Sequence, residues 1–271
     1  MAKIRLDALV FERGLVPSRE RAKTTIMSGL VFVNGQRADK PGAQVAADAT
    51  VELRGEGLKY VSRGGYKLER ALEQFGIDVT NRVCADIGAS TGGFTDCLLQ
   101  RGAARVFAVD VGYGQLAWSL RTDPRVTVLE RVNARGLTPE TLGGTVDFAT
   151  VDVSFISLRL ILPAVRTLLN VGGEVVCLVK PQFEAGRGKV GKNGVVRDIA
   201  THIEVLEAAL ENAKLSGFST LAMTHSPIRG PEGNIEFLSR LTLENTDTAI
   251  DCGAVARAAH AEFSTTEVRD D

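Results

Sequence analysis

The sequence contains no long hydrophobic run. Apolar stretches such as residues 175–179 are far shorter than the ~18 residues that a membrane-spanning helix needs. Residues 1–7 lack the hydrophobic core of a signal peptide. The four cysteines are far apart and form no CxxC pair, so we expect neither a zinc site nor a disulfide framework. Together these absences predict a protein of the reducing cytoplasm that does not depend on a metal.

The composition is that of an ordinary globular protein, with 44% hydrophobic and 24% charged residues in a chain of 271. A chain of this composition can bury a sizeable core, which excludes disorder as its main state. The net charge of −1 conceals an asymmetry: residues 1–67 carry 12 lysines and arginines against 7 acidic residues, and the remainder carries 20 against 26. A basic front segment favours contact with a polyanion, although a solvated charged surface would have the same composition.

The front segment is predicted to form two helices followed by a small hairpin sheet. An apolar face spans residues 6–15, and Ser18 is a good N-cap for a second helix through Ser28. Residues 31–36 run into an Asn-Gly turn, and a short strand follows at 50–53. The alternative is a helical hairpin that merely docks on the main body.

This order of elements resembles the S-four-type (αL) RNA-binding domain, a small α+β module. We place this domain at residues 1–54 and a linker at 55–62. The resemblance implies that basic side chains of this segment contact RNA, and the candidates are Arg5, Arg19, Lys23 and Lys40. Arg19 and Lys23 lie one helical turn apart on the second predicted helix.

Beyond the linker, short apolar runs alternate with helical stretches. The runs are 83–87, 106–110, 126–129, 146–151 and 175–179, and the helical stretches lie near 92–101, 114–121, 157–169 and 198–215. This alternation predicts an α/β fold with a mostly parallel sheet covered by helices on both faces. An antiparallel pair of strands is expected between residues 218 and 243. The tail after Asp251 is weakly patterned, and we expect a polar, frayed end there.

A glycine-rich turn, residues 86–94, follows the first strand of this region and opens a helix, as in nucleotide-binding sites. Asp110 ends the second strand, where a carboxylate can accept both ribose hydroxyls. A dinucleotide and S-adenosylmethionine both fit this geometry, and a glycine turn without a ligand is a third possibility. Ser90 replaces the second glycine of the dinucleotide fingerprint, and Asp86 suits an ammonium better than a pyrophosphate, which favours S-adenosylmethionine. The candidate ligands are Asp86, Gly88, Ser90, Gly92, Gly93, Asp110 and Asn133.

Two charged residues follow the fourth and fifth strands, Asp152 and Lys180. The carboxyl ends of parallel strands line the ligand crevice of an open sheet, so both side chains are expected to face the methyl donor. A lysine beside carboxylates can assist the proton loss that methylation of a sugar hydroxyl requires. The alternative is a structural ion pair.

Six motifs, at 61–68, 88–94, 110–116, 152–155, 178–183 and 233–237, together resemble the TlyA family. Its members join an S-four domain to an FtsJ-like methyltransferase, and some were named haemolysins. The resemblance implies a Rossmann-like class I methyltransferase domain, here over 63–245, with a C-terminal tail at 246–271. It further implies ribose 2′-O-methylation of cytidine in large-subunit and in some members small-subunit ribosomal RNA, with the catalytic tetrad on Lys67, Asp152, Lys180 and Glu236. Without the family, Lys67 and Glu236 would be interpreted as solvated charges.

Other residues are candidates for contact with RNA. Phe155 is placed where a flipped nucleotide could stack, although a core phenylalanine is nearly as good an interpretation. The loop at 183–194 combines glycines with cations and suits a mobile lid over phosphates, or an ordinary surface loop. It contributes Arg187 and Lys189, and Arg63 precedes the methyltransferase domain. The three histidines, His202, His225 and His260, are expected to cluster with nothing.

Two rival functions remain open to the sequence. One is a membrane-active haemolysin, which the absence of a spanning run or strongly apolar amphipathic helix disfavours. The other is an RNA-binding ribosome-assembly factor without catalysis, which the intact glycine loop and tetrad disfavour. The expected partners are ribosomal RNA and ribosomal subunits, with neither a membrane nor a metal; the sequence predicts no oligomeric state.

Overall fold

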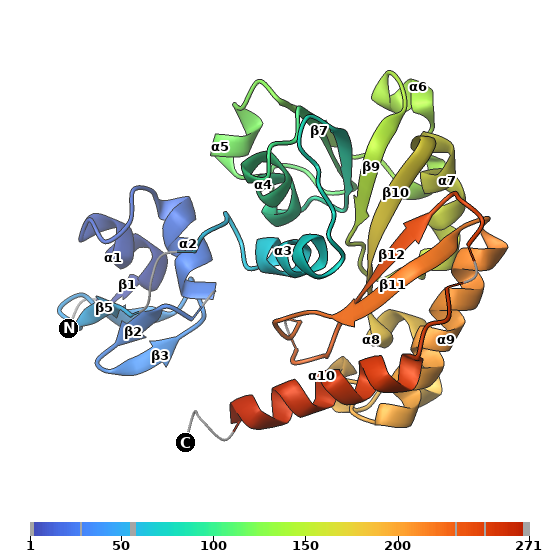
Figure 1. Cartoon of the computed structure of the whole chain (residues 1–271). Helices are drawn as coiled ribbons and strands as arrows, with labels where there is room; N and C mark the ends of the chain where they lie inside the picture. Colours follow the sequence, from blue (N-terminus) through green and yellow to red (C-terminus); the bar gives the residue numbers. More distant parts are fainter. Residues whose placement is uncertain (1–2, 28, 55–57, 231, 247, 268–271) are drawn as a thin grey trace. The chain divides into compact units, whose positions relative to one another are not determined.

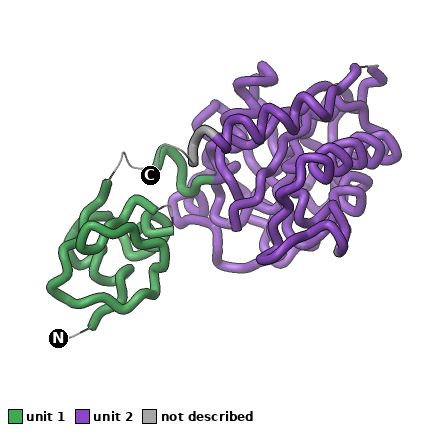
Figure 2. Tube along the Cα trace, turned by 90° about the horizontal axis from the view of Figure 1, so that it is seen from below, with its two compact units in different colours: residues 1–63 green, residues 64–271 purple. Residues whose placement is uncertain are grey.

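The computed structural model describes residues 3–27, 29–54, 58–230, 232–246 and 248–267 (Figure 1). The chain divides into two compact units, residues 1–63 and 64–271, which Figure 2 colours green and purple. Each unit has its own cluster of buried apolar side chains. Of the predicted linker, residues 55–57 lie outside the described part of the chain.

The front unit contains the two predicted helices, α1 (Leu6–Glu12) and α2 (Arg19–Met27). Ser18 caps α2, because its Oγ accepts a hydrogen bond from the Arg21 backbone N–H at 3.0 Å. The predicted hairpin is present as β2 (Val31–Val33) and β3 (Gln36–Ala38), and β5 (Val51–Leu53) pairs with the other edge of β2. Two further strands, β1 (Lys3–Arg5) and β4 (Gln44–Ala46), form a separate antiparallel pair. The sequence did not indicate this pair, because its two strands lie far apart in the sequence and no hairpin turn joins them.

The second unit is built on a seven-stranded sheet in the order β11-β12-β10-β9-β6-β7-β8. Its strands are β6 (Val83–Ile87), β7 (Arg105–Asp110), β8 (Val126–Glu130), β9 (Val146–Val151), β10 (Leu169–Val179), β11 (Ser219–His225) and β12 (Phe237–Thr242). Strands β6 to β10 are parallel neighbours, and β12 lies antiparallel between β10 and β11. The expected parallel sheet and the expected antiparallel pair are therefore both confirmed.

Helices cover both faces of this sheet. They are α3 (Gly64–Gln74), α4 (Gly93–Gln100), α5 (Trp118–Arg121), α6 (Pro139–Leu142), α7 (Leu162–Leu168), α8 (Pro181–Glu184), α9 (Ile199–Leu215) and α10 (Cys252–Glu267). On one face, buried side chains of α7, α9 and α10 pack against Ala85, Ile87 and other strand residues. Asp86 lies between these two residues and bonds Thr95 of α4, so α4 covers the opposite face. The fold is a class I, Rossmann-like α/β fold.

The expectation of a frayed end after Asp251 is wrong. Helix α10, red in Figure 1, packs against α9 and β11. Its Cys252, Ala256, Ala259 and Phe263 are all buried. These residues are spaced four, three and four apart, which is the stripe of a helix with one buried face. Small side chains make this stripe weakly hydrophobic, so it did not stand out from the polar residues around it.

The expectation that the histidines cluster with nothing is also wrong. Nδ1 of the fully buried His202 on α9 lies 2.8 Å from Nε2 of His260 on α10. His225 at the end of β11 lies 2.8 Å from Glu262 of α10. Burial lowers the pKa of His202 to about 4 and also lowers that of His260, which favours a neutral pair. All three histidines therefore belong to the attachment of α10, which the sequence did not reveal.

No helix in the described part of the chain is long and apolar enough to span a membrane.

Candidate active site

A pocket of about 430 Å³ lies where strands β6, β7 and β9 end. Four of the residues predicted to bind the cofactor line it, namely Gly88, Ser90, Asp110 and Asn133, together with Asp152 of the predicted tetrad. Its size is in the range of small-molecule sites, and its position matches the expected ligand crevice of an open parallel sheet. The pocket therefore brings the predicted glycine loop and the end of the fourth strand together.

Gly88 allows β6 and β9 to approach each other at this pocket. Its φ of +90° lies in a region that other residues rarely adopt. A Cβ built on Gly88 would lie 2.3 Å from the Asp152 carbonyl oxygen, which belongs to backbone and cannot move aside easily. Any larger residue would therefore push the glycine loop away from the end of β9.

The Asp110 carboxylate organises the same loop. One of its oxygens accepts a hydrogen bond from the Ser90 backbone N–H at 2.7 Å, and the other accepts one from the Gly112 N–H at 2.6 Å. Each carboxylate oxygen has two lone pairs, so both can still accept a further hydrogen bond from a ligand. The loop after β6 and the loop after β7 are thus tied together at the pocket wall.

Three of the predicted cofactor residues are not part of the described pocket wall. Asp86 is fully buried, and its carboxylate accepts hydrogen bonds from Thr95 at 2.7 Å and Thr150 at 3.0 Å. Burial raises its pKa to about 6. Gly92 and Gly93 form the start of α4. Asp86 fixes the first turn of α4 beneath the loop, because its carboxylate accepts hydrogen bonds from Thr95 on that helix. Direct contact of these three residues with the cofactor stays a prediction.

The four predicted tetrad residues form two lysine–carboxylate pairs. Lys67 Nζ on α3 lies 2.5 Å from Glu236 Oε2, just before β12. Lys180 Nζ, after β10, lies 2.5 Å from Asp152 Oδ1, after β9. The two lysines are each 8% exposed and Glu236 is 1% exposed. Buried charges are costly unless they are paired, so these pairings account for the presence of four ionisable groups here.

Ser154 is a neighbour of Lys180 that the sequence analysis did not single out. Lys180 Nζ donates a hydrogen bond to Ser154 Oγ at 3.0 Å, and both Ser154 and Asp152 line the pocket. The ammonium is therefore held by two residues of the pocket wall. A serine two residues after a strand-terminal aspartate carries no recognisable signal of its own.

The segment before Glu236 is shaped to accommodate that carboxylate. A Cβ on Gly230 would lie 2.6 Å from Glu236 Oε1, so glycine leaves the space the side chain occupies. Asn234 accepts a hydrogen bond from the Val196 N–H at 2.9 Å and donates one to the Gly194 carbonyl at 2.9 Å. Asn234 thus fastens the end of the glycine-rich loop to the Glu236 segment, which explains the asparagine in the 233–237 motif.

Phe155 stands exposed at the pocket rim. It is 90% exposed, which excludes the core interpretation, and its ring centroid is 5.0 Å from that of Phe183. Its φ of +63° is costly for a bulky side chain, and Ser90 in the same pocket has a φ of +49°. Strained backbone of this kind concentrates at functional sites, because the surrounding structure must hold it there.

The predicted RNA-binding residues of the front unit differ in their surroundings. Arg5 and Arg19 both donate to the buried Asp7 carboxylate, at 3.0 and 3.3 Å, and the Arg5 hydrogen bond lowers the pKa of Asp7 to about 2. Lys23 and Lys40 are exposed. The structure therefore gives the two arginines a structural task that the sequence did not indicate.

The remaining candidates are Lys189, Arg63 and Arg187. Lys189 is exposed and pairs with Glu204 of α9. Arg63 is partly buried in the front unit. The side chain of Arg187 lies outside the described part of the structure.

Among the side chains that the structure describes, no group of three or more His, Cys, Asp or Glu residues could hold a metal ion.

The chain matches two family models: an FtsJ-like methyltransferase over residues 60–242 and an S4 domain over 4–51. It is 46% identical to the 16S/23S rRNA (cytidine-2′-O)-methyltransferase TlyA of Mycobacterium tuberculosis, over 97% of this chain and 98% of that protein. It is 43% identical to Hemolysin A of Brachyspira hyodysenteriae, over 89% of this chain and 100% of that protein. A solved hemolysin-like protein from Streptococcus thermophilus superposes with a TM-score of 0.78 at 49% identity, covering 98% of this chain and 99% of that one. The chain belongs to the TlyA family of FtsJ-like methyltransferases.

Proposed function

We propose that this protein transfers a methyl group from S-adenosylmethionine to the ribose 2′-hydroxyl of a cytidine in ribosomal RNA. The observation that carries the proposal is the presence of two lysine–carboxylate contacts with buried lysines, Lys67–Glu236 and Lys180–Asp152, the second of which reaches the wall of the pocket. The relatives named rRNA (cytidine-2′-O)-methyltransferases support this choice of substrate.

The pocket fits the methyl donor. The Asp110 carboxylate has lone pairs available for two ribose hydroxyls. Asp110 is the last residue of the second parallel strand, where nucleotide-binding folds place such a carboxylate. Asn133 lines the same pocket beyond the third strand and can reach an adenine edge. Gly88 keeps the loop close to the end of β9. In this proposal Gly88, Ser90, Asp110 and Asn133 bind the donor, while Asp86, Gly92 and Gly93 hold the loop and helix that carry them.

A sugar hydroxyl must lose its proton as its oxygen attacks the methyl group, and in this proposal that proton passes to solvent water. S-adenosylmethionine supplies a methyl group on a positively charged sulfur, which leaves as a neutral thioether. Lys180, held by Asp152 and Ser154, places its ammonium beside the pocket, where it can orient the 2′-hydroxyl and stabilise the negative charge that develops on that oxygen. Lys67 and Glu236 form the second charged pair of the tetrad. Phe155 offers an exposed ring on which a flipped base can stack.

The front unit contributes RNA binding in this proposal. Its match to the S4 domain and its surplus of basic residues support contact with the ribosomal RNA backbone. Lys23 and Lys40 are the exposed candidates, with Lys189, Arg187 and Arg63 as further ones. Action on ribosomal RNA also favours a cytoplasmic protein.

The test is transfer of a tritiated methyl group to purified large and small ribosomal subunits, followed by mapping of 2′-O-methyl groups. The subunits come from cells that lack this protein, so that the target is unmodified. Label on a cytidine ribose is the expected result. Label on a base, or no label on either subunit, would contradict the proposal, and leakage of liposomes by the pure protein would favour the haemolysin alternative.

A further inference from the structure

Helix α10 lies outside the region that matches the FtsJ-like model, yet it contacts the helix that carries Lys67. Arg70 of α3 donates two hydrogen bonds to Glu262 of α10, from Nη1 to Oε2 at 3.0 Å and from Nη2 to Oε1 at 2.9 Å. Arg70 Nη1 also lies 3.1 Å from His225 Nε2, at the end of β11, and His225 in turn lies 2.8 Å from Glu262. One guanidinium therefore joins three elements.

This cluster is partly shielded from water. The side chains of Arg70, Glu262 and His225 are 22%, 38% and 9% exposed. Two parallel N–H···O bonds between a guanidinium and a carboxylate fix geometry more strictly than a single contact. Arg70 also lowers the pKa of Glu262, which keeps the carboxylate ionised. The cluster is a geometric restraint on α3.

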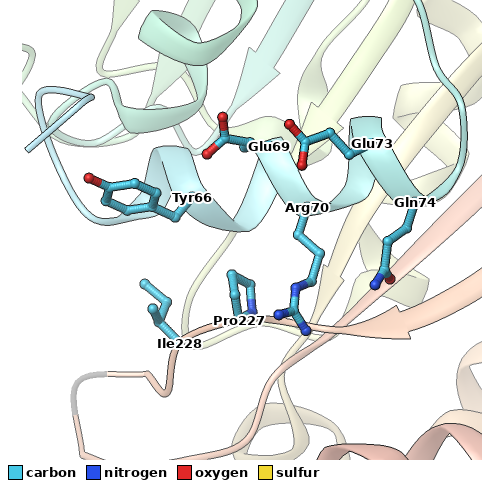
Figure 3. A pocket seen from close by; sticks show the side chains of 7 residues that line it. All are labelled: Tyr66, Glu69, Arg70, Glu73, Gln74, Pro227 and Ile228. Carbon is cyan, nitrogen blue, oxygen red and sulfur yellow. The ribbon is translucent and has the colours of Figure 1, made fainter. Parts of the chain in front are cut away.

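The side of α3 that faces residues 227–228 is open. A groove of about 590 Å³ lies there, lined by Tyr66, Arg70 and Gln74 from the helix and by Pro227 and Ile228 across from it (Figure 3). Figure 3 shows Arg70 extending from α3 toward Pro227, while Glu69 and Glu73, which also line the groove, point away from Pro227. The contacts of Arg70 with His225 and Glu262 are therefore made at an open groove beside α3.

A second arginine also restrains α3. Arg101, at the end of α4, pairs with Glu69 at 3.1 Å and also with Glu73. Arg101 and Arg70 thus restrain the helix from two directions. Lys67 lies on this helix three residues before Arg70, and its Nζ must stay at its contact with Glu236.

We propose that Glu262 and His225, acting through Arg70, are positioning residues that fix α3 and thereby hold Lys67 against Glu236. This inference rests on the proposed methyl transfer. Misplacement of a catalytic group by about 1 Å can cost on the order of 10²-fold in rate, so loss of a restraint one turn from Lys67 is expected to lower the rate of the chemical step. Donor and RNA binding, which use other residues, are expected to persist.

The experiment compares single-turnover methyl transfer to ribosomal subunits by Glu262→Ala, Arg70→Ala and the double variant, all at saturating donor and RNA. We expect each single variant to be about 10- to 100-fold slower, with donor and RNA affinities within about twofold of the unmodified protein. The double variant is expected to be no slower than the slower single variant, because both changes remove the same restraint.

Two variants on α10 serve as controls. Ala256→Gly weakens the helix at a fully buried position without touching Arg70, and Arg257→Ala removes an exposed charge from the same helix. We expect Ala256→Gly to lower the melting temperature and Arg257→Ala to change little, both with normal transfer rates. If Glu262→Ala has a lower melting temperature but transfers the methyl group at the normal rate, Glu262 has only a structural role and the inference is overturned.

Amide hydrogen exchange tests this inference independently of the proposed function, because it needs no methyl transfer. Amide exchange across residues 64–74 is expected to rise at least about tenfold in Glu262→Ala and not in Ala256→Gly. If the unmodified protein transfers no methyl group, the proposed function fails. Unchanged exchange in α3 of Glu262→Ala would overturn the inference whatever the activity.

Discussion

At the scale of single residues, Lys180 connects the pocket wall to the tetrad. Its ammonium contacts both Asp152 and Ser154, and these two residues line the pocket in which the donor is proposed to bind. No other contact in the described structure ties a tetrad lysine directly to two residues of that wall. The role of Lys180 can therefore be tested apart from binding.

Lys180→Ala is expected to fold and to bind S-adenosylmethionine and RNA, but to transfer the methyl group at least ~10²-fold more slowly, the scale of a positioned acid–base group. Lys180→Arg is expected to restore little, because a planar guanidinium differs in shape from the compact ammonium that contacts Asp152 and Ser154. The measurement is single-turnover transfer beside binding isotherms for the same variants. Near-normal transfer by Lys180→Ala would place the chemistry elsewhere.

Asp86 allows a prediction about pH. Its folded-state pKa of about 6 lies above the ordinary value of 3.8, so the folded state favours the protonated form. The stabilisation from this group is fully present below pH 3.8 and is lost as the pH rises to about 6, a loss of about 3 kcal/mol at 1.36 kcal/mol per unit. Between pH 4 and pH 7 the free energy of unfolding of Asp86→Asn is therefore expected to rise by that amount relative to that of the unmodified protein.

Urea unfolding, followed by the fluorescence of Trp118, the only tryptophan of the chain, measures this difference in the second unit. The result to look for is a change with pH in the free energy of unfolding of Asp86→Asn relative to the unmodified protein. A constant difference from pH 4 to pH 7 would mean that Asp86 titrates normally.

Asp110 separates the methyltransferase interpretation from the dinucleotide alternative. Asp110→Ala removes the acceptor for the donor's ribose, a charge-assisted hydrogen bond of ~1.5–3 kcal/mol, and it also releases the Ser90 and Gly112 N–H groups. We expect donor affinity to fall by at least about tenfold in calorimetry. Saturable binding of NADH to the unmodified protein would instead support the dinucleotide interpretation.

At the residue scale, the sequence was enough to predict that Asp152 and Lys180 lie together, but not which way the Asp86 side chain points. Asp152 and Lys180 directly follow strands, and the parallel topology alone brings their positions to one edge of the sheet. Asp86 lies inside a strand that is buried on both faces, so its side chain points toward α4 only because α4 covers that face. A single sequence does not contain that information, because both faces of a central parallel strand are apolar.

At the scale of elements, an ion pair between Asp7 and Arg19 joins the two helices of the front unit. Asp7 lies in the first turn of α1 and is fully buried, and it accepts hydrogen bonds from Arg5 and from Arg19 of α2. The sequence indicated both helices and the cap at Ser18, since these signals are local. It did not indicate that Arg19 spans the helices, because that contact depends on how they pack.

This contact changes the choice of residues for a test of RNA binding. Lys23→Ala combined with Lys40→Ala is expected to weaken RNA binding and to reduce its salt dependence by about two phosphate contacts, with unchanged donor affinity. Arg19→Ala is the contrasting variant: it leaves Asp7 with one arginine partner and is expected to lower the melting temperature of the front unit. RNA affinity and salt slope that stay the same in the double lysine variant would exclude these lysines from the interface.

Helix α10 was the largest error of prediction at this scale. Its buried stripe consists of a cysteine, two alanines and one phenylalanine, so its hydrophobic contrast with the exposed face is small. The histidine and glutamate contacts that attach it join residues distant in sequence, His202 with His260 and His225 with Glu262. Such pairs arise from tertiary packing, which the hydrophobic periodicity of a sequence does not predict.

At the scale of the whole molecule, charge is divided unevenly between the two units. The segment from residue 58 to the end carries 23 lysines and arginines against 26 acidic residues, whereas the basic surplus lies in the first 57. An acidic body does not attract a polyanion by its net field, so most of the electrostatic attraction to ribosomal RNA is expected from the front unit. The second unit has its own core and contains every residue of the proposed donor site.

Deletion of residues 1–57 tests this division of labour. The remaining chain is expected to fold and to bind S-adenosylmethionine within about twofold of the full-length affinity. Its affinity for ribosomal subunits should fall, and the slope of log affinity against log salt should become shallower by several phosphate contacts, since each contact contributes roughly 0.7 to 0.9 to that slope. Donor binding measured by calorimetry on the same preparation is the control for folding. An unchanged slope would mean that the acidic body carries the RNA contacts through local basic patches, and the front unit would then need another role.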